Sequence, residues 1–196
     1  MNIIMTSPPA TTAVALADVK AQLNIDTADD DTRLTGLILA ATETVETHIG
    51  RALITRSYSG YLNWWPSSPE GHVRSWINLE KPPLISVSAI TSYDDSDVGT
   101  VYPAANYYVD TIRTPGRVML RRGQIWPIPL RMANGIQIDW TCGYGADPSF
   151  IPPTLKLAIQ VQVGVLNEAR GDETSAQAMH PTVELMLSPY LFSPPS

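Results

Sequence analysis

Hydrophobic residues recur with a helical spacing towards both ends of the chain, and this period is lost in the middle. The clearest case is Asp31–Ile49, where aliphatic side chains recur at steps of three and four residues while charged residues fall elsewhere. A shorter segment, Ala15–Leu23, carries three aliphatic residues on one face. The pattern therefore predicts a short helix followed by a long one. The residues before them, Met1–Thr12, are expected to form a loose arm because Pro8 and Pro9 oppose regular structure.

The C-terminal part begins with Pro152 and Pro153, which suit the start of a helix. The segment that follows, up to Leu166, is apolar on nearly every side, and helices of this kind are usually buried all round. In a chain of this size we expect part of that surface to be covered by a neighbouring subunit. Pro181–Leu187 is predicted to be a final short helix.

The middle of the chain is rich in β-branched and aromatic residues and is punctuated by proline, glycine and aspartate. The breaks separate five short runs, which predict an antiparallel sheet or a small sandwich. The predicted strands are Thr55–Leu62, Ile85–Tyr93, Tyr107–Thr111, Arg117–Arg121 and Gly135–Cys142.

These elements indicate an α+β fold, with a small helical bundle as core and a large antiparallel β insertion between the early and late helices. Residues 1–50 are expected to form the N-terminal arm and core helices, and residues 51–146 the insertion. Residues 147–187 return to the core, and residues 188–196 are expected to be an extended tail with three prolines.

Composition narrows the functional classes. Only 16% of the residues are charged, against about 25% in typical domains, which favours a surface partly covered by other subunits. The net charge of -6 disfavours general affinity for nucleic acid, which depends on Lys and Arg. A single cysteine, Cys142, excludes an intrachain disulfide. No leader or membrane-spanning pattern is evident, so we expect a soluble protein made inside the cell.

The sequence gathers no residues in a pattern typical of catalysis, so no catalytic, cofactor-binding or metal-binding residue is predicted. His48, His72 and His180 lie far apart and none has a second ligand at a metal-site spacing. The acidic run beginning at Asp94 lacks the glutamate that would close a calcium loop and is predicted to be a hairpin turn. Cys142 has no histidine nearby in sequence.

Aromatic residues are the candidates for contacts with partners. Trp64 and Trp65 are equally consistent with a contact patch at a hairpin tip and with packing inside the β insertion. Tyr190, Leu191 and Phe192 lie in the proline-rich terminus, where little core is available to bury them, and we expect them to contact a partner.

Two functional classes, a binding module and an enzyme, stay open on the residues alone. A carbohydrate- or receptor-binding module could use Trp64, Trp65 and Trp76 on the β insertion. A hydrolase could assemble a site from distant residues such as His72, Asp110 and Asp139, although nothing in their spacing supports one.

Several short segments, in this order and at this spacing, resemble the head-to-tail connector (adaptor) proteins of tailed bacteriophages and gene transfer agents. The resemblance spans about residues 14–190. The segments that carry it are Leu16–Leu23, Asp29–Asp31, Leu37–Glu43, Ile49–Ile54, Leu79–Leu84, Val87–Thr91, Tyr107–Asp110, Pro115–Arg117, Trp126–Pro127, Thr141–Gly145 and Ile151–Ile159.

The resemblance implies a structural protein, not an enzyme, that forms a homo-oligomeric ring, expected to be a dodecamer, beneath the portal protein. Such a ring extends the DNA channel and offers a docking platform to a stopper or tail-terminator protein. Double-stranded DNA would pass through it without sequence-specific binding. The protein would be made in the host cytoplasm and end in the neck of the virion, away from membranes. Tyr190, Leu191 and Phe192 would then contact the portal.

Overall fold

The computed structural model describes residues 1–67, 71–128, 130–169 and 179–192. The chain divides into two compact units, neither of which is continuous in sequence. The β unit consists of Met1–Pro8 and Thr55–Gly143, and the helical unit consists of Pro9–Ile54 and the chain from Tyr144 onward. The fold is α+β, as predicted.

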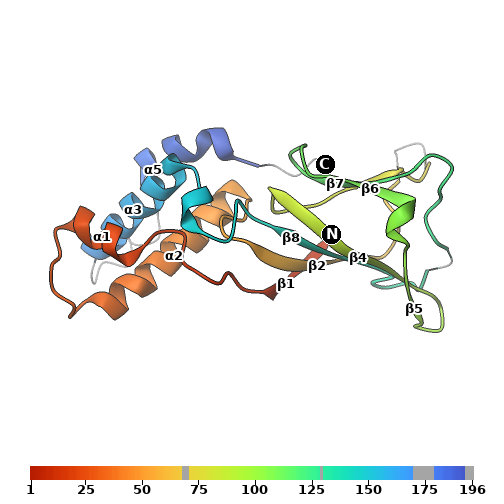
Figure 1. The fold of residues 1–196 in the computed structure, drawn as a ribbon, viewed down its shortest axis with the longest axis horizontal. Helices are drawn as coiled ribbons and strands as arrows, with labels where there is room; N and C mark the ends of the chain where they lie inside the picture. The colour runs from red at the N-terminus through yellow and green to blue at the C-terminus, as the bar shows by residue number, and fades with distance from the viewer. Residues whose placement is uncertain (68–70, 129, 170–178, 193–196) are drawn as a thin grey trace. The chain divides into compact units, whose positions relative to one another are not determined.

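The larger sheet of the β unit has five strands in the order β1-β2-β8-β4-β5, and every neighbouring pair is antiparallel. Figure 1 shows β1, β2, β8 and β4 side by side. The strands are β1 (Asn2–Ser7), β2 (Arg56–Leu62), β8 (Ile136–Cys142), β4 (Leu84–Tyr93) and β5 (Gly99–Val101).

The central strand β8 shows why this sheet forms. Its odd and even positions alternate between partly exposed and buried, so one face of the strand is apolar. Trp140 on that face is fully buried and stacks on Tyr58 of β2, with 5.9 Å between ring centroids. The strand predicted over Gly135–Cys142 is therefore confirmed, with one face in the core.

A second sheet has three antiparallel strands in the order β3-β7-β6. Its inner face contributes buried Ile77, Val118 and Tyr107 to the core. The strands are β3 (Trp76–Asn78), β7 (Arg117–Leu120) and β6 (Tyr107–Asp110), and the one-turn helix η1 (Ala104–Asn106) precedes β6.

The N-terminal residues differ from the prediction. The expected loose arm contains the edge strand β1, which pairs with β2 and belongs to the β unit. Pro8 and Pro9 limit the strand to the preceding residues but do not prevent it, because the edge of β2 offers main-chain partners. The structure divides the chain after Pro8, Ile54 and Gly143, whereas the sequence boundaries were placed after residues 50 and 146.

Over its described residues, the helical unit contains four α-helices around one apolar cluster. Helix α3 packs against α2 and α5, and α1 contacts both α2 and α3. The helices are α1 (Leu16–Leu23), α2 (Asp31–Ile49), α3 (Pro153–Glu168) and α5 (Pro181–Leu187), with one-turn helices η2 (Pro148–Phe150) and η3 (Ser188–Tyr190). The predicted helices are thus all present.

Helix α3 is buried on one side only within the chain. Leu155, Ala158, Ile159 and Val163 are fully buried in the cluster, whereas Leu157 is 43% exposed. The described residues of its unit therefore leave part of the apolar surface of the helix uncovered. Burial of the remainder against a neighbouring subunit stays a prediction.

The tail also differs from the prediction over its described part. Residues 188–196 were expected to be extended, yet Ser188–Tyr190 forms a turn of 3-10 helix that continues α5. Tyr190 packs against the apolar cluster and is partly buried there, which the pattern of residues did not predict. Residues 193–196 lie outside the described residues.

Candidate functional site

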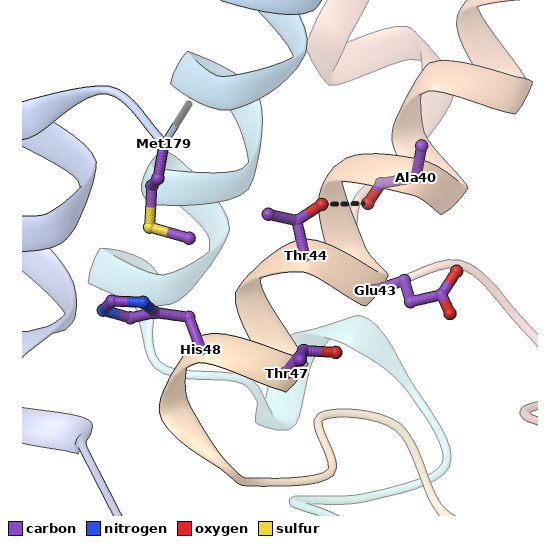
Figure 2. A pocket seen from close by; sticks show the side chains of 6 residues that line it. All are labelled: Ala40, Glu43, Thr44, Thr47, His48 and Met179. Atoms are coloured by element: carbon purple, nitrogen blue, oxygen red, sulfur yellow. Dashed lines mark hydrogen bonds between the residues drawn. The ribbon is translucent and has the colours of Figure 1, made fainter. Parts of the chain in front are cut away.

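The helical unit has a groove of about 540 Å³ beside α2, lined by Ala40, Glu43, Thr44, Thr47, His48 and Met179. Figure 2 shows His48 beside Met179, while Glu43 points to the other side of the helix. The hydroxyl of Thr44 donates to the carbonyl oxygen of Ala40 at 2.9 Å and is used within the helix. The imidazole and the carboxylate do not converge, so the groove lacks the arrangement that acid–base chemistry needs.

Three other residues that were considered for chemistry and set aside have structural roles. His180 is the N-cap of α5, because its Nδ1 accepts from the backbone N–H of Thr182 at 3.2 Å. The carboxylate of Asp94 accepts from the backbone N–H groups of Ser96 and Val98, which forms the turn between β4 and β5. Cys142 is buried in β8. The predicted hairpin turn is confirmed.

The hydrolase alternative gains no support from the contacts. Asp139 of β8 accepts hydrogen bonds from Ser59 and Gln137 on the five-stranded sheet. Asp110 of β6 pairs with Arg117 at 3.1 Å on the three-stranded sheet. Within the described ranges there is no cluster of three or more His, Cys, Asp or Glu residues that could hold a metal. None of the helices described has the length and hydrophobicity needed to cross a membrane.

The two adjacent tryptophans occupy different environments. Trp65 is only 7% exposed and stacks on Trp126, with 4.4 Å between centroids and 10° between planes. Its Nε1 donates to the carbonyl oxygen of Pro127 at 2.8 Å. Trp64 is 58% exposed. Packing inside the β unit therefore accounts for Trp65, and Trp64 is the one available to a partner. Of the three tryptophans in the carbohydrate-binding alternative, Trp64 and Trp76 are therefore exposed and Trp65 is buried.

Trp65 belongs to an aromatic cluster that the sequence did not reveal. Trp126 also lies 5.7 Å from Tyr102, which in turn lies 6.1 Å from Tyr107. Two further polar groups are satisfied by loop carbonyls, since the Nε1 of Trp126 donates to the carbonyl oxygen of Arg74 and the hydroxyl of Tyr102 donates to that of Ile125. Burial raises the pKa of Tyr102 and of Tyr107, so both phenols stay neutral at physiological pH.

An apolar groove of about 400 Å³ lies beside this cluster. Val73, Ile125 and Ile128 line it and are exposed. Exposed aliphatic residues around an aromatic floor are typical of protein contact surfaces. Sequence reasoning treated the segment around Trp126 as a break between strands, and only its unusual content of isoleucine and tryptophan could have signalled a surface of this kind.

The C-terminal aromatic residues lie against the end of α2. The guanidinium Nε of Arg51 donates to the carbonyl oxygen of Tyr190 at 2.6 Å. The backbone N–H of Phe192 donates to the carbonyl oxygen of Ile49 at 2.9 Å. Leu191, between these two attachments, is 50% exposed. Tyr190 and Phe192 are thus held by hydrogen bonds, and the side chain of Leu191 between them is exposed.

A model of one known protein family matches part of this chain. Residues 14–82, which include α1, α2, β2 and β3, match the model of the family described as phage gp6-like head-tail connector protein. The resemblance stated from the sequence is therefore confirmed over this stretch. No curated protein is significantly similar to the chain.

Solved structures with the same fold come from gene transfer agent (GTA) particles. A chain in the neck of an empty GTA particle, computed with C6 symmetry, has a TM-score of 0.81 and 24% sequence identity, covering 98% of this chain and 96% of that one. A chain in the native GTA virion has a TM-score of 0.79 and 22% identity, with the same coverage of both chains. A chain in the neck of a native GTA particle, computed with C12 symmetry, has a TM-score of 0.77 and 23% identity, again with that coverage.

Proposed function

We propose that this chain is a structural head-to-tail adaptor in the neck of a phage or phage-like particle, and that it carries out no catalysis. The observation that carries the proposal is the likeness of nearly the whole chain to chains from GTA necks. The connector family match over residues 14–82 supports the same role independently of the structural likeness. The adaptor would form a ring beneath the portal, extend the DNA channel and provide the platform for a stopper or tail-terminator protein.

We propose a ring of twelve copies, because the symmetries used for the related necks are C12 and C6. Ring closure requires two different complementary faces on each subunit. Leu39 of α2, Leu157 of α3 and Leu185 of α5 are exposed in the single chain. Burying such aliphatic side chains contributes about 1.5–3 kcal/mol each, so contacts that cover them would help to hold copies together.

The proposed portal contact is the segment Tyr190–Phe192. Because Tyr190 and Phe192 are attached to Arg51 and Ile49, Leu191 is presented from a fixed position. A preorganised contact loses less conformational entropy on binding than an extended tail would. This refines the expectation from the sequence, since the described part of the tail is held before any partner arrives.

The net charge of -6 fits a channel protein that repels the DNA backbone and leaves the polymer free to move. We therefore propose that DNA passes without sequence-specific binding, that no cofactor is needed, and that the protein resides between head and tail.

The test is complementation of particles that lack this protein. Leu191→Glu should leave folding unchanged and reduce attachment to portal-bearing heads by about tenfold or more, as expected for a central contact residue. Ile112→Glu, which places the same charge on an exposed residue of the β unit, is the matched control. Imaging of wild-type particles should place the protein in the neck. Its location elsewhere would overturn the proposal.

A further inference from the structure

The outer face of the three-stranded sheet carries an unusual set of side chains. Met119 of β7 lies opposite Trp76 of β3 and opposite Tyr108 of β6. Residues directly opposite in antiparallel strands share a face, so these three form a row across the sheet. Tyr108 is 53% exposed and Trp76 is 36% exposed. The inner face already supplies the core, so this row is not needed to fill it.

Two arginines lie over this row. The guanidinium of Arg121 lies 3.7 Å from the ring centroid of Tyr108, and that of Arg74 lies 5.8 Å from Trp76. Neither forms an ion pair within the described part of the chain, whereas Arg117 on the same face pairs with Asp110. The Nε of Arg121 is buried and has no hydrogen-bond partner among the described residues. We name Arg74, Trp76, Tyr108, Met119 and Arg121 the Arg–aromatic face.

The composition of this face is that of a protein contact. Tryptophan, tyrosine, methionine and arginine are the residues enriched in the cores of interfaces. A guanidinium stacked on an aromatic ring is held in place, so pairing it with a carboxylate costs little additional entropy. The face therefore favours a partner that combines acidic groups with an apolar surface.

The helical unit of the same chain offers that combination. It contains twelve acidic against five basic residues, whereas the β unit contains seven acidic against eight basic residues. A groove of about 460 Å³ between α1 and the start of α2 is lined by aliphatic Leu16, Ala17, Ala21 and Ile25 and by Asp26. Lys20 and Asp31 also line it, and they pair with each other at 2.6 Å, so the charge of this lysine is already neutralised within the chain. Asp18, Asp26 and Asp29 are exposed and have no ion-pair partner within the described residues. We name this groove and these three acids the acidic corner.

We propose that the Arg–aromatic face of one copy docks onto the acidic corner of a second copy. The inference rests on the proposed function, because it names the contact by which the ring closes. The aromatic rings would lie against the aliphatic groove, and the two guanidinium groups would pair with Asp26, which lines it, and with exposed Asp18 or Asp29. The contact joins two different surfaces, so each copy binds one neighbour through each surface, and the series closes into a ring when the rotation between successive copies closes. A second copy is favoured over DNA because the chain as a whole is acidic.

The test uses two full-length charge-reversal variants, Arg74→Glu/Arg121→Glu and Asp26→Lys/Asp29→Lys. Each variant alone opposes like charges at every contact, and self-association measured by sedimentation velocity at low salt should weaken at least about tenfold. Mixing them in equal amounts restores opposite charges at every contact, so assemblies of alternating copies should reappear. Arg113→Glu/Lys81→Glu and Glu168→Lys/Glu184→Lys are matched controls outside the two surfaces and should associate like the wild type.

Three results would overturn the inference. In the first, neither variant weakens the self-association seen for the wild type. In the second, the mixture stays dissociated although both variants are folded. In the third, the wild type stays monomeric up to about 1 mM. If a reversed variant loses cooperative unfolding, Arg74→Gln/Arg121→Gln must weaken association instead. Binding of a DNA duplex that requires Arg121, without self-association, would assign the face to nucleic acid. If the inference fails in this way but particle necks still contain the protein, the proposed function stands.

Discussion

The backbone N–H of Phe192 donates a 2.9 Å hydrogen bond to the carbonyl oxygen of Ile49, the last residue of α2. The last carbonyls of a helix lack partners within the helix, and this bond satisfies one of them with the C-terminal segment. The turn at Gly50 makes the contact possible, because its φ of 68° is left-handed and its Cα carries no side chain. The segment proposed to reach the portal therefore also completes the end of a core helix.

Substituting Gly50→Ala should destabilise the protein and release this segment. A Cβ there would lie 2.8 Å from the carbonyl oxygen of Phe192, and alanine is strained at this φ. We expect a loss of about 1–3 kcal/mol in the free energy of unfolding, measured with urea. Gly36→Ala, in the middle of the same helix with open space around it, should instead stabilise by about 0.5–1 kcal/mol. The same sign for both variants would contradict the prediction.

The tryptophan pair should respond unequally to truncation. Trp65→Ala removes the stacking on Trp126 and the hydrogen bond to Pro127, and should cost about 3–5 kcal/mol. Trp64→Ala removes an exposed side chain and should change stability by about 0.5 kcal/mol or less. Thermal unfolding of both variants measures the difference. Comparable losses would show that Trp64 is also part of the packed cluster.

Glu46 is a buried acid with a structural role. Its Oε1 accepts a 2.7 Å hydrogen bond from the backbone N–H of Leu53, which fixes the chain after α2. Glu46→Ala leaves this buried N–H without its partner and should cost about 1–3 kcal/mol in chemical unfolding. Glu46→Gln keeps an acceptor and should lose less, and Glu43→Ala on the exposed side of α2 should be nearly neutral. A neutral Glu46→Ala would show that Leu53 finds another acceptor.

Asp110 should contribute to acid sensitivity. Its pKa is lowered, first by the backbone N–H of Arg113 and also by the guanidinium of Arg117, against an opposing effect of desolvation. A carboxyl group whose pKa is lower in the folded state stabilises above its unfolded pKa, and this contribution is lost as pH falls through the folded value. The window therefore lies below the ordinary pKa of 3.8.

The check is the urea midpoint of wild type and Asp110→Asn at pH 5 and at pH 3. The wild type should lose more stability between the two pH values than Asp110→Asn does, because only the wild type has this carboxylate to protonate. An equal loss in both proteins would show that the Asp110 contacts do not persist in solution.

The helices were predictable because the spacing of their aliphatic residues and the residues at their ends agree with the way they pack. Helix α2 begins at Asp31 and ends before Gly50, as its aliphatic spacing and the glycine indicate. The strands β3 and β5 were missed because three residues cannot show a period of two. Strand β1 was missed since a lone edge strand is stabilised by pairing with β2, which lies far along the sequence.

Site residues were harder to predict, because their roles depend on which side of an element they face. Trp64 and Trp65 are neighbours in sequence, and only the position of Trp126 decides which of them is buried. The Arg–aromatic face depends on the register between three strands, and that register follows from tertiary contacts. The tail was expected to be free because no sequence signal connects Tyr190 with Arg51.

The central position of β8 has a consequence for how the protein is made. The strands β2 and β4 both pair with β8, so on the ribosome the edge of each strand that faces β8 must wait for residues 136–142 before its backbone groups find partners. Helices α1 and α2 contact each other and depend on no strand for that contact, so they can begin to associate during synthesis. We therefore expect nascent chains that stop before residue 136 to expose unpaired strand edges and to bind chaperones. Chains that include β8 should bind chaperones less.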